Sequence, residues 1–279
     1  MAEYWQTTRF RLRLDRPLVM GIVNVTPDSF SDGGQHSTSA GAMAHCDRLL
    51  AEGADILDIG GESTRPGAAG PAVDEELARV LPVLRHAVTL GVAVSVDTSQ
   101  PEVMREALAL GVDIVNDVRA LQRPGALRVL TENGHAGVCL MHMRGEPGTM
   151  LHDTAYGDVV TEVCEWLRAR RDEVVASGVA SDRIALDPGI GFAKTADHNW
   201  QLMQRQSELL TLGRPLLLGW SRKATLGRLT GRDVRHRQAA SVAAALACVQ
   251  RGAAIVRVHD VAETVDALKV WRAAGLPNV

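Results

Sequence analysis

Eight short apolar runs alternate with segments of helical periodicity along this chain. The runs, which read as strands, are 18–25, 54–60, 92–97, 112–118, 137–143, 184–188, 215–220 and 253–259. The helical segments are roughly 39–52, 74–90, 100–110, 124–133, 158–177, 197–211, 236–251 and 262–274. Strands that alternate with helices in this way predict right-handed βαβ units and a parallel sheet.

The chain length decides between two ways of arranging such units. The 279 residues suit one (β/α)8 barrel, which typically takes about 250 residues. A doubly wound open sheet usually carries a G-x-G-x-x-G turn after its first strand, whereas here that strand runs into Asn24-Val-Thr-Pro-Asp28. The sequence therefore predicts an α/β fold, a (β/α)8 TIM barrel, as a single domain over residues 1–279. Residues 1–15 are expected to form a short hairpin over the N-terminal end of the barrel.

The positions of the glycines and the overall composition are typical of a compact protein. Left-handed glycines are expected near the predicted helix ends at Gly53, Gly91, Gly111, Gly134, Gly178, Gly213 and Gly252. The four cysteines form no C-x-x-C pair, so we expect buried, reduced thiols in the cytoplasm. The net charge of -3 gives no general attraction for nucleic acid or an anionic membrane. We find neither a signal peptide nor an apolar stretch near the ~18 residues of a membrane span.

Polar residues follow almost every predicted strand. In a closed barrel the C-terminal strand ends meet at one face, where active sites are built. One such residue is more often a helix cap or a structural ion pair than a ligand. Convergence from several strands favours a site. The residues expected around one cavity are Asp58, Asp97, Asn116, Asp187, Lys223, Arg257 and His259.

These residue types suit a flat heterocycle joined to an anion. The carboxylate of Asp187 can accept two parallel hydrogen bonds from adjacent ring N–H and NH2 groups, and Asn116 and Asp97 can contact the other ring edges. Lys223 can donate to a ring carbonyl or nitrogen. Two cations, Arg257 and His259, lie two residues apart on one strand face and suit a phosphate. The oxygen of Asn24 suits Mg²⁺, which is bound by few protein ligands besides phosphate and water.

The two longest sequence signatures resemble those of the dihydropteroate synthase family. They are Asn24-Val-Thr-Pro-Asp-Ser-Phe-Ser-Asp-Gly-Gly34 and Gly60-Gly-Glu-Ser-Thr-Arg-Pro-Gly67, and they lie within two Gly- and Pro-rich segments, 26–38 and 61–71, that are expected to close over the cavity. The resemblance continues in order through Val96-Asp-Thr98, Ile114-Val-Asn-Asp117, Asp187-Pro-Gly189, Ser221-Arg-Lys223 and Arg257-Val-His259.

The resemblance implies a dimeric (β/α)8 enzyme of folate synthesis. Its reaction condenses 6-hydroxymethyl-7,8-dihydropterin diphosphate with 4-aminobenzoate, and sulfonamides compete with the aminobenzoate. By motif, the pterin is held by Asp97, Asn116, Met141, Asp187 and Lys223; the diphosphate and Mg²⁺ by Asn24, Arg257 and His259; and the aminobenzoate by Thr64, Arg65, Pro66, Phe192, Ser221 and Lys223. Catalysis is expected to rest on electrostatics and positioning by Asp97, Lys223, Arg257 and His259, without a nucleophilic side chain.

Three positions depart from the commonest family pattern, and two other functions are compatible with part of these motifs. Ile190, Ala193 and Ala224 stand where Phe, Gly and Ser are usual, which bears on the shape of the aminobenzoate pocket. A pterin-binding methyltransferase domain would share the pterin set but would not need the Ser63-Thr-Arg-Pro66 loop or the Arg257-Val-His259 pair. A non-catalytic paralogue would have lost part of these motifs. Both motifs are present, which favours the synthase.

Overall fold

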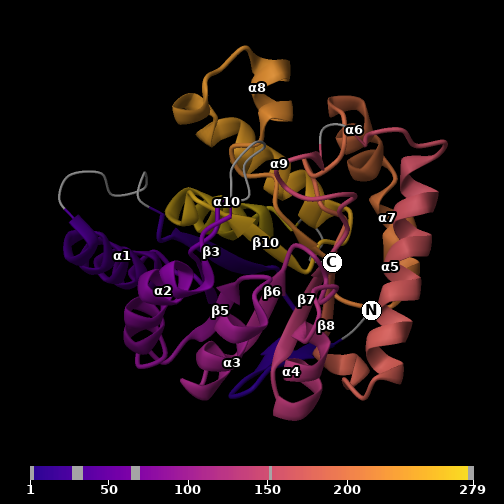
Figure 1. Ribbon diagram of the computed structural model, residues 1–279. Coiled ribbons are helices and arrows are strands. Elements are labelled where there is room, and N and C mark those ends of the chain that lie inside the picture. Colours follow the sequence, from indigo (N-terminus) through magenta and orange to yellow (C-terminus); the bar gives the residue numbers. More distant parts are fainter. Residues whose placement is uncertain (1–2, 27–33, 64–69, 151–152, 276–279) are drawn as a thin grey trace.

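Eight parallel strands form a barrel that is covered by helices (Figure 1). The computed structural model describes residues 3–26, 34–63, 70–150 and 153–275. The barrel strands are β3 (Leu18–Asn24), β4 (Ile56–Gly60), β5 (Ala93–Asp97), β6 (Ile114–Asp117), β7 (Gly137–Met141), β8 (Ile184–Asp187), β9 (Leu217–Leu218) and β10 (Ile255–Val258). Their order is β8-β7-β6-β5-β4-β3-β10-β9. A parallel bridge between Leu186 of β8 and Leu216, the residue before β9, joins the two ends of this order and closes the barrel. The predicted (β/α)8 barrel is therefore confirmed.

The helices confirm the predicted alternation and differ from it at two places. They are α1 (Gly34–Ala51), α2 (Val73–Ala87), α3 (Pro101–Ala109), α4 (Ala126–Asn133), α5 (Val159–Ala176), α6 (Ala196–Gln204), α7 (Gln206–Leu209), α8 (Ala224–Thr230), α9 (Gln238–Gln250) and α10 (Val261–Ala273). The helix predicted over 197–211 is interrupted at Arg205, which lies between α6 and α7. Helix α8 was not predicted, because its seven residues are too few to show a clear periodicity.

All seven glycines predicted to be left-handed have positive φ, from 65° at Gly134 to 108° at Gly178. Each ends a helical segment shortly before a strand, where an L-residue would meet a steric penalty. The four cysteines are buried and free, as predicted. No helix within the described ranges is long and apolar enough to cross a bilayer.

The interior of the barrel holds one apolar layer to which every strand contributes. Its members are Met20, Ile56, Ala93, Ile114, Cys139, Ala185, Leu217 and Ile255, all buried. The alternate strand residues, such as Leu57, Val94 and Val115, belong to the larger core between the strands and the helices. This alternation is the period of two that a strand imposes on its side chains.

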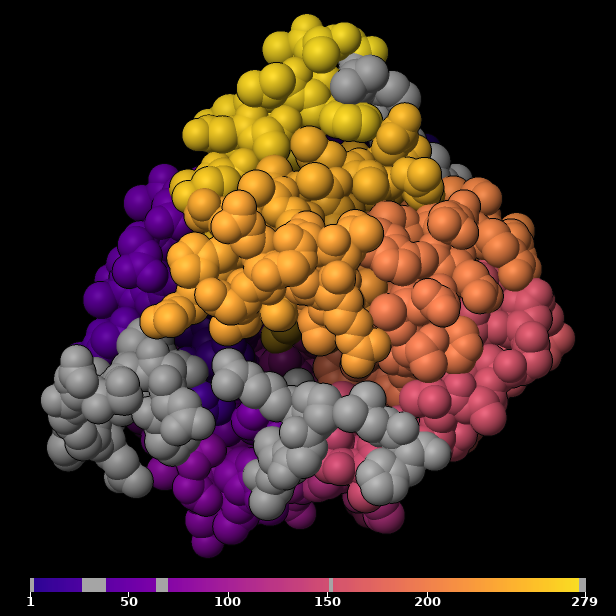
Figure 2. Space-filling model, turned by 90° about the horizontal axis from the view of Figure 1, so that it is seen from above, coloured from indigo at the N-terminus to yellow at the C-terminus, as the bar shows by residue number. Residues whose placement is uncertain are grey.

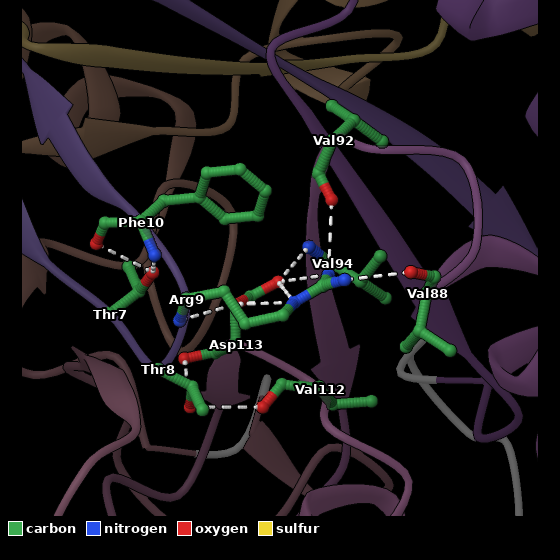
Figure 3. A network of polar contacts seen from close by, with 9 residues as sticks. All are labelled: Thr7, Thr8, Arg9, Phe10, Val88, Val92, Val94, Val112 and Asp113. Atoms are coloured by element: carbon green, nitrogen blue, oxygen red, sulfur yellow. Dashed lines mark hydrogen bonds and ion pairs between the residues drawn. The ribbon is translucent and has the colours of Figure 1, made fainter.

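An N-terminal hairpin closes the lower end of the barrel, as predicted. Strands β1 (Tyr4–Gln6) and β2 (Arg11–Arg13) pair antiparallel. Trp5, in the middle of β1, is fully buried in the interior layer, and its indole N–H donates to the carbonyl of Arg183 at 2.8 Å. The turn is tied to the barrel by Arg9, whose guanidinium donates to both carboxylate oxygens of buried Asp113 (Figure 3).

We expect Asp113→Asn to lower the free energy of unfolding by about 1–3 kcal/mol. The carboxylate of Asp113 also accepts the backbone N–H groups of Arg9 and Val94, each at 2.9 Å. An amide would turn an N–H group toward these donors. Urea denaturation measures the change, and Asp15→Asn, at the exposed ion pair with Arg13, is the control. Equal, small effects of the two substitutions would contradict this role.

Candidate active site

Side chains alternate between the two faces of a strand, and this alternation points the predicted residues into the barrel interior. Two residues beyond the apolar layer, the same inward face holds Ile22, Asp58, Ser95, Asn116, Met141, Asp187, Gly219 and Arg257. Two residues further lie Asn24, Asp97 and His259. The structure therefore brings the acids, the amides and the cations together at the C-terminal end of the strands. Figure 2 shows this end from above, with a hollow between the orange segment that carries α8 and the indigo and purple part of the chain.

Arg257 lies between two carboxylates. Its Nε donates to Asp58 Oδ2 and its Nη2 to Asp97 Oδ2, both at 2.6 Å. Burial opposes the guanidinium charge, but the two carboxylates more than offset this and raise the pKa of Arg257. Burial raises the pKa of Asp97 to about 7; Arg257 opposes that shift and the nearby Asp58 adds to it.

Asn116 completes this group from the neighbouring strand. Its Nδ2 donates to Asp58 Oδ2 at 3.1 Å. With an amide N–H used in this way, the carbonyl oxygen of Asn116 is the atom available to accept a bond from a ligand. Asp58 was expected near the cavity without a role, and the structure places it in contact with both Asn116 and Arg257.

Asp187 ends β8 and opens the turn that follows. Its Oδ1 accepts the backbone N–H of Gly189 at 2.7 Å. Burial raises the pKa of Asp187, while that N–H, Lys223 and Arg257 oppose the shift. Among the hydrogen bonds of the described residues, none engages its Oδ2. The turn thus uses one lone pair of Oδ1, and the second lone pair of Oδ1 and the whole of Oδ2 stay available to a ligand.

Lys223 faces the apolar side of the same cavity. Its Nζ lies 4.1 Å from the ring centroid of Phe192, and burial lowers the pKa of its ammonium group to about 8. Phe192 packs on a cluster that contains Met141. Gly191 permits this approach, since its φ is 80° and a Cβ there would lie 3.1 Å from Cδ of Lys223. The predicted residues Met141, Phe192 and Lys223 therefore do come together.

Ser221 and His259 form a pair beside Arg257. The hydroxyl of Ser221 lies 2.9 Å from Nδ1 of His259 and accepts the backbone N–H of the same residue at 3.1 Å. Burial, with the nearby cations Arg222 and Arg257, lowers the pKa of His259 to about 3. The imidazole is therefore neutral at physiological pH. A neutral ring whose Nδ1 accepts from Ser221 carries its proton on Nε2, where it can donate to an anion.

The turn between Ser221 and Lys223 depends on a residue that the sequence did not reveal. Arg222 has a left-handed φ of 59°, a conformation that costs a non-glycine residue energy. Its backbone N–H donates to the hydroxyl of Ser241 at 2.9 Å, and its guanidinium binds Asp260 at 2.5 Å. These contacts hold the turn that presents both predicted neighbours.

Lys194 is a second site residue that sequence reasoning missed. Its Nζ is buried, lies 2.9 Å from Nδ1 of His142, and donates to the carbonyl of Phe192 at 3.0 Å. It thereby joins the end of β7 to the segment after β8. The motif around Asp187 could have pointed to it, because Lys194 follows that carboxylate by only seven residues, on the segment that leaves the same strand end.

Part of the predicted site lies outside the described residues. This applies to Thr64, Arg65 and Pro66, and to most of the segments 26–38 and 61–71. Asn24 is described: it ends β3, in register with Gly60 of β4, and is partly buried. Across the described ranges, no three His, Cys, Asp or Glu side chains gather as a metal cluster. A single amide oxygen fits a Mg²⁺ ion whose other ligands are phosphate and water.

Residues 20–259 match the family model described as pterin binding enzyme. A dihydropteroate synthase of Neisseria meningitidis serogroup C is 54% identical over 281 residues, 99% of this chain and 99% of that protein. The chain belongs to the dihydropteroate synthase family. That membership favours the synthase over the methyltransferase domain, and the chain is an enzyme of this family.

Solved dihydropteroate synthases share the fold closely. The Xanthomonas albilineans enzyme, solved with 4-aminobenzoic acid, has a TM-score of 0.93 and 49% identity, and the match covers 99% of this chain and 100% of that one. The Yersinia pestis enzyme, solved as a sulfonamide drug complex, has a TM-score of 0.92 and 45% identity, with 98% and 99% covered. The N-terminal hairpin and the whole barrel thus fall within a shared architecture.

Proposed function

We propose that this chain condenses 6-hydroxymethyl-7,8-dihydropterin diphosphate with 4-aminobenzoate to give 7,8-dihydropteroate and diphosphate. One observation carries the proposal: a carboxylate and amide set, Asp97, Asn116 and Asp187, shares one barrel end with two anion-binding side chains, the Arg257 guanidinium and the neutral imidazole of His259. A pterin joined to a diphosphate needs both sets at once. The solved synthase with 4-aminobenzoic acid supports the second substrate.

The proposed pterin position follows from the hydrogen-bonding atoms that remain available. Asp187 accepts two parallel N–H bonds from the pyrimidine edge, and the carbonyl oxygen of Asn116 accepts another ring donor. Met141 packs against the ring, and Lys223 donates to the ring carbonyl or nitrogen. Because Asn116 and Asp187 are buried, their bonds to the pterin are stronger than they would be in water.

The proposed chemistry is a substitution at C9 of the pterin. The C9–oxygen bond breaks and its electron pair leaves with diphosphate, whose charge is stabilised by Arg257 and by the Nε2 proton of His259. Positive charge that develops on the pterin is stabilised by the carboxylate of Asp97. The arylamine nitrogen then bonds to C9 and releases a proton. Asn24 would hold Mg²⁺, which, when bound, neutralises diphosphate charge.

The assay that tests this function uses the purified full chain with both substrates and Mg²⁺. We expect release of diphosphate and formation of dihydropteroate in equal amounts, and neither product without 4-aminobenzoate. A sulfonamide should inhibit in competition with aminobenzoate. Absence of turnover, or transfer from a methyltetrahydrofolate donor in its place, would reject the proposal.

The proposal also covers assembly and location. We infer a cytoplasmic homodimer: the family resemblance implies a dimer, and four buried free cysteines suit a reducing compartment. Neither nucleic acid nor membrane is expected as a partner. Light scattering of the purified chain reports the mass, and a monomer at micromolar concentration would reject the dimer.

We expect Arg257→Ala and His259→Ala to weaken binding of the pterin diphosphate more than binding of the corresponding pterin alcohol. Loss of a buried charged partner costs about 2–5 kcal/mol, and loss of the neutral imidazole donor costs about 1–3 kcal/mol. Calorimetric titration of each variant with both ligands, in Mg²⁺, measures the difference. Equal losses for the two ligands would show that these residues are structural.

A further inference from the structure

Asp58 contacts both parts of the proposed site. It lies in the middle of β4, fully buried. Its Oδ2 accepts from Arg257 Nε at 2.6 Å and from Asn116 Nδ2 at 3.1 Å. Its Oδ1 has no hydrogen-bond partner among the residues that the structure describes. The two donors are far apart in sequence, separated from Asp58 by 199 and 58 residues.

The strand order explains why Asp58 can reach both donors. Along the barrel wall, β10 lies two strands from β4 on one side, and β6 lies two strands from it on the other. Asp58 points inward, one step beyond Ile56 of the apolar layer, so its carboxylate spans the interior between them. An apolar residue at this position would fill the same space without meeting either donor.

Each contact decides which atoms face the ligand. Asn116 uses an N–H on Asp58, so its oxygen is left for the pterin. Arg257 uses Nε on Asp58 and Nη2 on Asp97, and no hydrogen bond of a described residue engages its Nη1. A buried carboxylate costs free energy unless it is hydrogen-bonded. The hydrogen bonds that stabilise Asp58 therefore also fix the positions of Arg257 and Asn116.

We propose that Asp58 is a positioning residue that orients Arg257 toward the diphosphate and Asn116 toward the pterin at the same time. The inference rests on the proposed function, and it assigns to Asp58 a task that neither of its partners performs. Asp58 acts through these two side chains and not as a catalytic residue. Disturbing it should therefore weaken recognition of both parts of one substrate.

The test uses two variants that separate charge from position. Asp58→Glu keeps the charge and moves the carboxylate by one methylene, whereas Asp58→Asn keeps the size and removes the charge. Each is titrated separately with 6-hydroxymethyl-7,8-dihydropterin and with inorganic diphosphate plus Mg²⁺. We expect both affinities to fall about tenfold in both variants. Asp113→Asn and Asp113→Glu, which disturb the ion pair between buried Asp113 and Arg9 at the opposite barrel end, should leave both affinities unchanged.

A double-mutant cycle measures whether the effects of Asp58 and Arg257 on diphosphate affinity depend on each other. A merely structural role of Asp58 would give no such dependence. Asp58→Glu combined with Arg257→Ala should bind diphosphate no more weakly than Arg257→Ala alone, because the partner that it positions is gone. Tighter diphosphate binding in Asp58→Asn would overturn the proposal, since Asp58 would then only offset the charge of Arg257. Losses equal to those of the Asp113 variants, or additive losses in the cycle, would also overturn it. Failure of the wild-type chain to turn over would reject the proposed function instead.

Discussion

Replacing Asp187 with asparagine is expected to reduce pterin affinity far more than tenfold while the barrel stays folded. The carboxylate can accept two parallel N–H bonds from the pterin edge, whereas an amide presents an N–H group to one of those donors. Leaving a buried donor against another donor costs about 2–5 kcal/mol. The fold should persist because the internal bond of Asp187, to the Gly189 N–H at 2.7 Å, can still be made by an amide oxygen.

Calorimetry with 6-hydroxymethyl-7,8-dihydropterin measures the loss, and circular dichroism with thermal unfolding checks the fold. Asp197→Asn is the matched control, because Asp197 is an exposed aspartate in the first turn of α6. We expect wild-type affinity from that variant. Unchanged affinity in a folded Asp187→Asn chain would mean that Asp187 only shapes the turn before Gly189.

Sequence reasoning predicted the barrel because its signal is repeated and local. Each predicted strand or helix can be recognised from neighbouring residues alone. Eight alternations of strand and helix are compatible with few topologies. The convergence of Asp97, Asn116, Asp187 and Arg257 followed from the same rule, because parallel strands bring their C-terminal ends to one face. The inward orientation of these side chains could also be counted, two residues beyond the apolar layer formed by residues such as Ala185 and Ile255.

The sequence could not predict in the same way which side chains form hydrogen bonds with each other inside the cavity. Arg257 meets Asp58 and Asp97 across 199 and 160 residues, and any inward acid on the barrel was an equal candidate. The backbone of Arg222 was hidden for a different reason: left-handed φ is typical of glycine, so an arginine gives no local sign of it. Its conformation is set by Ser241 and Asp260, which belong to other elements.

Lys194 shows how a buried cation can go unnoticed in a sequence. The chain has only three lysines, at positions 194, 223 and 269, and a lysine is ordinarily expected at the surface. Lys194 is buried because the segment after β8 folds back onto His142, a contact between residues 52 positions apart in the sequence. Burial lowers the pKa of Lys194 to about 7, Asp187 opposes that shift, and Lys223 and Arg144 add to it. The adjacent His142 is neutral, because burial lowers its pKa to about 2.

This environment predicts a pH dependence of stability that a single substitution should remove. Between pH of about 7 and the ordinary lysine pKa of about 10.4, the amine of Lys194 is protonated in the unfolded chain and neutral in the folded chain. The unfolded state then binds more protons, so stability rises with pH in this window. Below pH of about 7 both states are charged, and the folded chain bears the full cost of burying the cation. The slope contributed by Lys194 is at most about 1.4 kcal/mol per pH unit.

Lys194→Met should therefore stabilise the chain most at pH 6–7, with a benefit that shrinks by about 2–3 kcal/mol toward pH 9. Methionine suits the neighbouring cluster of Met141, Met143 and Ala193, although the bond to the Phe192 carbonyl is lost at every pH. Urea denaturation of both proteins across this range gives the difference curve. Lys269→Met, at an exposed lysine, should give a flat one. A flat curve for Lys194→Met would mean that the buried amine does not change its protonation between pH 7 and 9, and that its hydrogen bonds alone hold the segment after β8.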